Sequence, residues 1–187
     1  MKIGFFPGSF DPIHFGHVNL AIQMLEKLSL KKVIFCPTSI SPLKVEEPPK
    51  ANGSHRLNML RLALKESIFE VLDYEVNNSS VSYTIDTLKH LKTEDEIVLI
   101  LTEESIKDFH LWKEYENILK LSTLAVGVRN KNFKKNSIII SKNNIITTDI
   151  FNISSTGIRN RIKNGLYIRH LTFKEVIDYI YENRLYL

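Results

Sequence analysis

The chain has 187 residues, of which 43% are apolar and 25% are charged, a globular composition that excludes disordered and collagen-like chains. Its formal net charge of +4 is a modest bias that suits anionic small molecules and does not by itself indicate a nucleic acid. We expect no membrane helix, no signal peptide and, with Cys36 as the only cysteine, no intrachain disulfide, so a cytoplasmic protein is the simplest interpretation.

The apolar pattern predicts strands and helices that alternate along the chain. Strands are predicted over residues 2–6, 32–36, 69–73, 96–101 and 121–128, with two short ones at 138–140 and 145–146. Helices are predicted over residues 14–28, 55–65 (capped by Ser54), 84–91, 111–119, 155–163 and 172–182. This alternation indicates an α/β protein with a doubly wound, mostly parallel sheet, a small C-terminal helical part and one domain, residues 1–187.

The first strand ends in a turn that is rich in candidate ligand-binding residues. Ligands of doubly wound sheets bind at the carboxyl ends of the strands, and the first such end is the segment Gly8 to His17. Gly8 gives this turn conformational freedom, and His14 and His17 lie three residues apart, so both point the same way from a helical turn. Two imidazoles beside free backbone N–H groups predict a phosphate site. A metal site or a pair of buried core histidines are the alternatives, although no third metal ligand is obvious.

A second cluster, Ile153-Ser-Ser-Thr-Gly-Ile-Arg159, opens a predicted helix. Its hydroxyls and free N–H groups suit a phosphate, and Arg159 lies one turn further on. Helix capping alone would also explain these residues. Two anion-binding helix starts far apart in the sequence would suit a nucleoside triphosphate. Neither a Gly-x-Gly-x-x-Gly dinucleotide fingerprint nor a P-loop motif is present.

Both clusters resemble signatures of the HxGH nucleotidyltransferase superfamily, and three further segments resemble the bacterial nicotinate-nucleotide adenylyltransferases. These segments are Ser82-Tyr-Thr-Ile-Asp-Thr-Leu88, Phe109-His-Leu-Trp112-Lys-Glu-Tyr115 and the ending from Val176-Ile-Asp-Tyr-Ile180 to Leu185-Tyr186. The likeness covers nearly the whole chain in the right order. It implies a Rossmann-like nucleotidyltransferase fold, and transfer of the adenylyl group of ATP to nicotinate mononucleotide, giving deamido-NAD and pyrophosphate with Mg²⁺.

The resemblance also implies roles for individual residues. His14, His17 and Arg159 would be catalytic, and no protein-held metal is implied. The ATP and phosphate contacts would come from Gly8, Ser9, Phe10, Lys44, Glu104, Ser155 and Thr156. Nicotinate would be bound by Thr84, Trp112 and the weaker candidate Tyr115. Core packing by Trp112 and a merely solvated Lys44 are the alternatives. The partners would be ATP and nicotinate mononucleotide, without nucleic acid or membrane, and a homo-oligomer is compatible with the sequence.

The sequence departs from the family pattern in two places. Thr102-Glu-Glu104 stands where the family has Gly-x-Asp, whose Asp meets the ATP ribose, and Leu43 replaces a histidine after the second strand. These departures leave room for a degenerate, non-catalytic nucleotide-binding protein. Transfer to nicotinamide mononucleotide or pantetheine phosphate is the nearest alternative reaction. The basic residues within 129–145 predict a solvated loop, and an RNA-binding module is the other interpretation.

Overall fold

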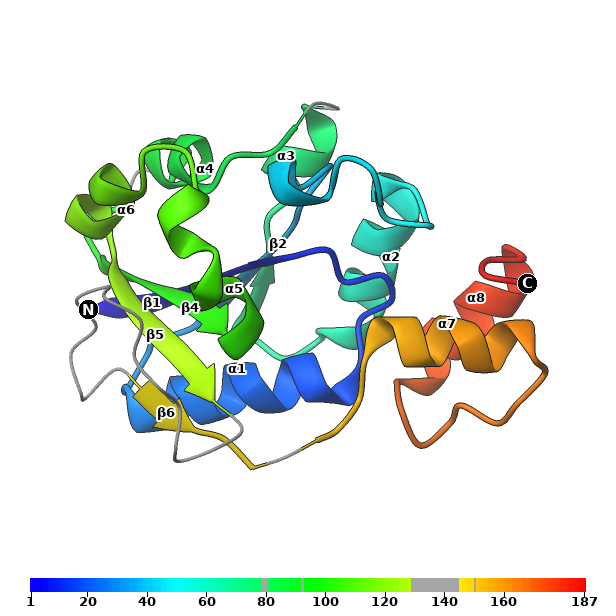
Figure 1. Cartoon of the computed structure of the whole chain (residues 1–187). Coiled ribbons are helices and arrows are strands. Elements are labelled where there is room, and N and C mark those ends of the chain that lie inside the picture. Colours follow the sequence, from blue (N-terminus) through cyan, green and yellow to red (C-terminus); the bar gives the residue numbers. More distant parts are fainter. Residues whose placement is uncertain (79–80, 92, 129–144, 150) are drawn as a thin grey trace.

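A six-stranded parallel sheet forms the centre of the computed structural model, which describes residues 1–78, 81–91, 93–128, 145–149 and 151–187 (Figure 1). The strands are β1 (Lys2–Gly8), β2 (Val33–Pro37), β3 (Phe69–Val71), β4 (Glu96–Thr102), β5 (Thr123–Val128) and β6 (Ile145–Thr147). Their order is β3-β2-β1-β4-β5-β6, and every pair of neighbours is parallel. The predicted doubly wound sheet is therefore confirmed, and its strand order reverses between β1 and β4.

Helices cover both faces of this sheet (Figure 1). They are α1 (Phe15–Lys27), α2 (Gly53–Ala63), α3 (Tyr74–Asn77), α4 (Thr84–His90), α5 (Glu103–Lys107), α6 (Tyr115–Leu121), α7 (Ser155–Lys163) and α8 (Lys174–Glu182). Two 3₁₀ turns join them, η1 (Pro42–Lys44) and η2 (Phe109–Leu111). Apolar residues of α1, α2, α7 and α8 belong to one core cluster, and those of α4, α5 and α6 belong to the other.

Strict alternation along the central strands separates the two core clusters. In β4, Val98 and Ile100 pack with the first cluster, whereas Ile97, Leu99 and Leu101 pack with the second. Side chains of a strand point to opposite faces in turn, so a run that is apolar throughout is buried on both sides. The continuous apolar run in β4 therefore places its carboxyl end between two helical layers.

Several element boundaries differ from the sequence-based prediction. Asn52, not Ser54, caps α2, because the Asn52 side chain accepts a hydrogen bond of 2.9 Å from the His55 N–H. The helix predicted over 111–119 is instead η2 followed by α6, which starts after Glu114 at a φ of 52°. The short helices α3 and α5 were not predicted. The predicted strand at 145–146 is confirmed as part of β6, and that at 138–140 lies outside the described residues.

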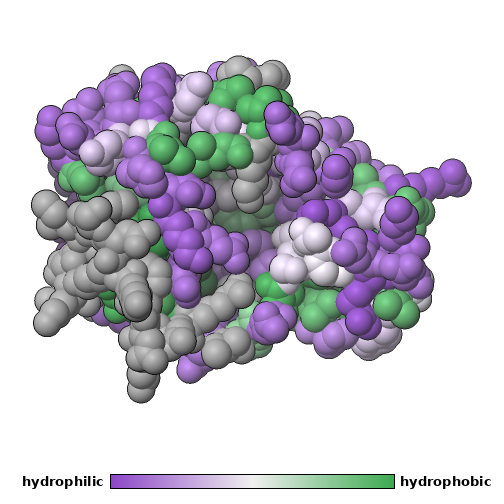
Figure 2. Space-filling view, viewed as in Figure 1, coloured by the Kyte–Doolittle hydropathy of each residue, from purple (hydrophilic) through white to green (hydrophobic). Residues whose placement is uncertain are grey.

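The C-terminal helices pack at the β2 side of the molecule, beside the turn that follows β1 (Figure 1). Thr172, only 1% exposed, donates its hydroxyl to the Ile13 carbonyl at 2.7 Å. The Phe15 N–H donates to the Leu171 carbonyl at 3.1 Å. The C-terminal part is thus attached directly to the β1–α1 turn. On the face drawn in Figure 2, apolar residues are scattered among hydrophilic ones, and the surface is hollowed near its centre.

Candidate active site

Two adjacent cavities lie at the carboxyl ends of β1 and β4, where the strand order reverses. The larger has a volume of about 490 Å³ and the smaller about 270 Å³. Both are lined by Pro7, Gly8 and Ser9 from the end of β1 and by Glu104 and Ser105 from α5. These five residues, here called the shared wall, form a common boundary between the two cavities.

The turn after β1 owes its shape to Phe10 rather than to a strained glycine. Phe10 has a φ of 47°, a left-handed conformation that non-glycine residues rarely adopt. A Cβ atom on Gly8 would lie 2.9 Å from the Phe10 ring, so Gly8 is required for space. The unusual backbone conformation that we expected at Gly8 occurs instead at Phe10, two residues later. Gly8, Ser9 and Phe10 all line the larger cavity.

The two predicted histidines meet at the start of α1. His14 is the N-cap residue, and its N–H donates to His17 Nδ1 at 3.3 Å. The two rings stack with their centroids 3.7 Å apart at an interplanar angle of 20°. A Cβ atom on Gly16 would lie 3.0 Å from His14 Nδ1, so glycine leaves room for this stack. Both imidazoles line the larger cavity.

His17 is held as a neutral ring in the free protein. Burial, and secondarily the charge of His14, lower the pKa of His17 well below its usual value near 6.5. Because Nδ1 accepts the His14 N–H, the proton of the neutral ring lies on Nε2. His17 can therefore offer an N–H donor to an anion.

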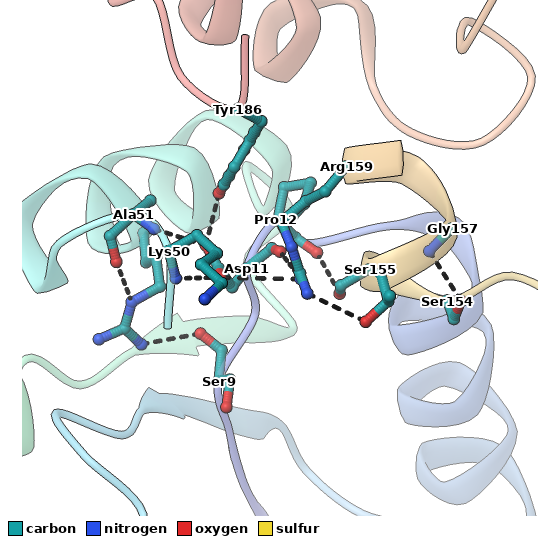
Figure 3. A network of polar contacts seen from close by, with 12 residues as sticks. Ser9, Asp11, Pro12, Lys50, Ala51, Ser154, Ser155, Gly157, Arg159 and Tyr186 are labelled. Atoms are coloured by element: carbon teal, nitrogen blue, oxygen red, sulfur yellow. Dashed lines mark hydrogen bonds and ion pairs between the residues drawn. The ribbon is translucent and has the colours of Figure 1, made fainter. Parts of the chain in front are cut away.

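Residues of the second predicted cluster cap α7 and also donate hydrogen bonds to the β1–α1 turn. Ser154 caps α7 by accepting the Gly157 N–H at 3.1 Å. Ser155 donates its hydroxyl to the Pro12 carbonyl at 2.8 Å (Figure 3). Arg159 donates to the Asp11 carbonyl at 2.7 Å and to Thr156 Oγ1 at 3.0 Å. Ser155, Thr156 and Arg159 line the larger cavity opposite the histidines' helix, so the structure brings both signatures together.

Asp11 is a site residue that the sequence reasoning did not single out, although it lies within the first signature. It is 3% exposed, and its carboxylate accepts the backbone N–H groups of Lys50 at 2.7 Å and Ala51 at 3.1 Å. The Tyr186 hydroxyl also donates to it, at 2.6 Å (Figure 3). Asp11 thus joins the phosphate turn to the segment before α2 and to the end of the chain.

Arg56 in α2 was also missed. It is 2% exposed and donates to three backbone carbonyls, those of Ser9 at 2.8 Å, Ala51 at 3.1 Å and Ser39 at 3.2 Å. Burial lowers the pKa of this guanidinium from its usual value. The only available sequence signal was an arginine beside the apolar positions of a helix, which is weak because long basic side chains commonly reach solvent.

The smaller cavity contains two of the three residues assigned to nicotinate. Thr84 begins α4, and Trp112 follows η2, and both line this cavity. Trp112 is half-buried and packs 5.3 Å from the Phe109 ring, so it serves the core as well. Tyr115 is not among the lining residues of either cavity, because its ring packs against Phe109.

The departures from the family pattern have local explanations in part. Thr102 caps α5, and its Oγ1 accepts the Ser105 N–H at 3.2 Å. Glu104 is exposed in the shared wall, and Leu43 lines the smaller cavity. Lys44 ends η1, and its side chain lies outside the described atoms.

In the described ranges, no group of three or more His, Cys, Asp or Glu side chains is arranged to hold a metal ion. None of the helices within those ranges is both long and apolar enough to span a bilayer.

Comparison with known proteins places the chain among nucleotidyltransferases. The model of the cytidylyltransferase-like family matches residues 5–161. A probable nicotinate-nucleotide adenylyltransferase from Dictyoglomus thermophilum is 38% identical, with 100% of both chains covered. One from Aquifex aeolicus is 47% identical over 66% of this chain and 75% of its own. The Plasmodium falciparum nicotinic acid mononucleotide adenylyltransferase complexed with NaAD has the same fold, with a TM-score of 0.72 at 22% identity, covering 99% of this chain and 97% of its own.

Proposed function

Because this chain belongs to the nicotinate-nucleotide adenylyltransferases, we propose that its two cavities hold the two substrates of that reaction. The enzyme transfers the adenylyl group of ATP to nicotinate mononucleotide and releases pyrophosphate. The observation that carries the assignment of the cavities is the shared wall, since it lets two separately bound molecules meet at one boundary. ATP occupies the larger cavity, and the nicotinate end of the mononucleotide occupies the smaller one.

Alignment and charge stabilisation account for the chemistry. A phosphate oxygen of the mononucleotide forms a bond to the α-phosphorus of ATP, and the bond from that phosphorus to the bridging oxygen breaks as pyrophosphate leaves. The attacking oxygen is already ionised at neutral pH, so no general base is needed. The protein must therefore hold the two phosphates in line and stabilise the charge that develops between them.

The residues around the larger cavity supply donors for this task. His17, through its Nε2–H, and His14 contact the phosphates of ATP and stabilise the transition state. The backbone N–H groups of Ser9 and Phe10 add to them. Ser155, Thr156 and Arg159 hold the β- and γ-phosphates and then pyrophosphate, with Lys44 as a further positive charge. The role of Lys44 rests on the resemblance alone. The other roles rest on the placement of the residues at one cavity and on the anion preference of helix starts.

A divalent cation enters with ATP, and we propose that it is Mg²⁺. Mg²⁺ keeps several waters and is usually bound by substrate phosphates with one or two carboxylates, which fits a site without a three-residue metal cluster among its described side chains. The carboxylates that line the larger cavity are those of Asp11, Glu47, Glu103, Glu104 and Asp149, and Asp11 is already bound to Lys50, Ala51 and Tyr186. When bound, the ion would neutralise phosphate charge.

The smaller cavity distinguishes nicotinate from nicotinamide. Trp112 offers an aromatic face to the pyridine ring, and the Thr84 hydroxyl and nearby N–H groups donate hydrogen bonds to the carboxylate. Donors arranged for a carboxylate are poorly paired by a neutral amide, so we expect nicotinate mononucleotide to be preferred by at least about tenfold.

An acceptor assay tests the function. Purified protein receives ATP, Mg²⁺ and one of nicotinate mononucleotide, nicotinamide mononucleotide, pantetheine phosphate or glycerol phosphate, and pyrophosphate release is measured. Fast release with the nicotinate compound alone is expected. Equal rates with both mononucleotides would overturn the assignment of the acid, and no release with any acceptor would favour a non-catalytic nucleotide-binding protein.

Three broader expectations accompany this function. Residues 1–187 act as one domain, since hydrogen bonds join the C-terminal part to the β1–α1 turn. We expect the enzyme to work in the cytoplasm and to bind neither nucleic acid nor membrane. A homo-oligomer remains an expectation for size-exclusion chromatography with light scattering to test.

A further inference from the structure

A continuous chain of polar contacts runs from the C-terminal end of the protein to the shared wall (Figure 3). Tyr186 donates to Asp11, Asp11 accepts the Ala51 N–H, the Ala51 carbonyl accepts Arg56 Nε, and Arg56 donates to the Ser9 carbonyl. The backbone of a single residue, Ala51, links the acidic and the basic partner. Residues far apart in the sequence thus meet behind the phosphate turn.

Asp11 is well supplied with donors that carry no charge. Its Oδ1 accepts from Ala51 and Tyr186, and its Oδ2 accepts from Lys50. Arg159 approaches the same carboxylate more loosely, with NH1 3.7 Å from Oδ2. Arg159 instead donates its short hydrogen bonds to the Asp11 carbonyl and to the Thr156 hydroxyl. The neutral donors therefore satisfy Asp11 without a tight ion pair to Arg159.

The backbone near the end of the chain turns sharply and so places the Tyr186 hydroxyl beside Asp11. Arg184 and Tyr186 have φ values of 52° and 64°, in the left-handed region that non-glycine residues rarely adopt. Such conformations persist where surrounding contacts hold them. Burial and the Asp11 carboxylate also raise the pKa of Tyr186, so its hydroxyl remains a donor at all relevant pH values.

We propose that Tyr186 is a positioning residue for ATP: by donating to Asp11 it keeps Arg159 available for the phosphates. Without the hydroxyl, Asp11 Oδ1 loses one of its two donors in a buried place and becomes a stronger partner for the nearby guanidinium. Arg159 is then drawn toward Asp11 and away from the larger cavity. The proposal rests on the function proposed above for that cavity, and it adds a residue that touches no substrate.

Calorimetric titration of the full chain with Mg-ATP, and separately with nicotinate mononucleotide, tests the idea. Tyr186→Phe removes only the hydroxyl, and we expect the Kd for ATP to rise on the order of tenfold, as when one hydrogen bond to a charged group is lost. The Kd for the mononucleotide should change by less than about twofold, since its cavity contains neither Asp11 nor Arg159.

Tyr179→Phe is the matched control. Its hydroxyl contacts His55 and Asn58, both at 2.9 Å, so it also joins the C-terminal part to α2 but does not touch Asp11. A general loosening of α8 on α2 would weaken ATP binding in both phenylalanine variants. We expect ATP binding to be weakened only in Tyr186→Phe.

A double variant examines the route through Arg159. If Tyr186 acts by releasing Arg159, then Tyr186→Phe has no further effect on ATP affinity in an Arg159→Ala background. Additive losses, equal losses for both substrates, or unchanged ATP affinity in folded Tyr186→Phe would each overturn the inference. Because binding is measured without turnover, a protein that binds ATP but fails the acceptor assay would refute the proposed reaction while leaving this test intact.

Discussion

Two stacked imidazoles stand at the start of α1, and we expect their loss to affect turnover far more than folding. His17→Ala and His14→Ala should each lower kcat by about a hundredfold, the scale for removing one donor from a transition state. Circular dichroism should show a folded protein. His170→Ala is the control, since that ring stacks on Tyr167 at 5.8 Å and lines neither cavity.

Two results would contradict this role for the histidines. Near-normal turnover in folded His17→Ala would remove His17 from the phosphate site. Zinc bound at about one ion per chain, and lost in the same variant, would instead support the metal site that the His-x-x-His spacing left open.

The low pKa of His17 makes stability depend on pH. In the unfolded chain His17 takes up a proton near its ordinary pKa of about 6.5, whereas in the folded protein it does so only at a much lower pH. The unfolded state therefore binds more protons below that value, and folding stability falls as the pH decreases, by at most about 1.4 kcal/mol per pH unit. Urea titrations from pH 7.5 to 5 should show a shallower decline for His17→Gln than for the natural protein. Parallel declines would mean that His17 titrates normally.

At the residue scale, motif spacing identified three groups at the larger cavity and missed two buried residues that hold its turn in place. His14, His17 and Arg159 lie in motifs whose local geometry the sequence determines. Asp11 and Arg56 depend on partners dozens of residues away, at the segment before α2 and at the end of the chain. No local pattern reports such contacts.

At the scale of single elements, the start of α5 leads us to predict weak discrimination between ATP and 2′-deoxy-ATP. Glu104, which the resemblance implies as the counterpart of a ribose-binding aspartate, is exposed, and a glutamate is one methylene longer than an aspartate. Hydrogen bonds depend steeply on geometry, so we expect kcat/KM for 2′-deoxy-ATP to lie within about tenfold of that for ATP. Glu104→Gln should leave this ratio nearly unchanged, as should the remote control Glu116→Gln. Strong rejection of 2′-deoxy-ATP by the natural protein would show that the ribose is held tightly after all.

Element prediction succeeded where periodic apolar patterns were long and failed for short helices. The apolar residues of the central strands and of α1 follow patterns long enough to distinguish a strand from a helix. α3 and α5 have 4 and 5 residues, too few for a helical period to stand out. The start of α2 was misplaced because Ser54 and Asn52 are both good caps, and the extended backbone of Asn52 decides between them.

At the scale of the whole molecule, Thr172 should measure how firmly the C-terminal part is attached. Thr172→Val keeps the shape and leaves the buried Ile13 carbonyl without its donor, at a cost of about 1–3 kcal/mol. A protein of this size loses about 2–4 °C in Tm per kcal/mol, so we expect a fall of roughly 2–12 °C in one cooperative transition. Thr147→Val, an exposed position in β6, is the control. A fall below about one degree, or two separate transitions, would contradict a rigid attachment.

The sheet as a whole was predictable because alternating strands and helices leave few arrangements open, and right-handed crossovers fix their hand. The two cavities were not. Their shared wall joins residues from the turn after β1 with residues from α5, and only the neighbouring positions of β1 and β4 bring those together. Long-range strand pairing of this kind is invisible to a local pattern.

The shared wall has a consequence for what happens after the chemistry. In the proposed arrangement, each cavity binds its own molecule before the reaction, and one covalent dinucleotide reaches into both cavities afterwards. When one half of the dinucleotide dissociates from its cavity, the other half still holds the product in place. The free half therefore stays at a high effective concentration near its own cavity and rebinds. Product departure should then be slower than that of either substrate, and synthetic ligands that bridge the wall should gain affinity in the same way.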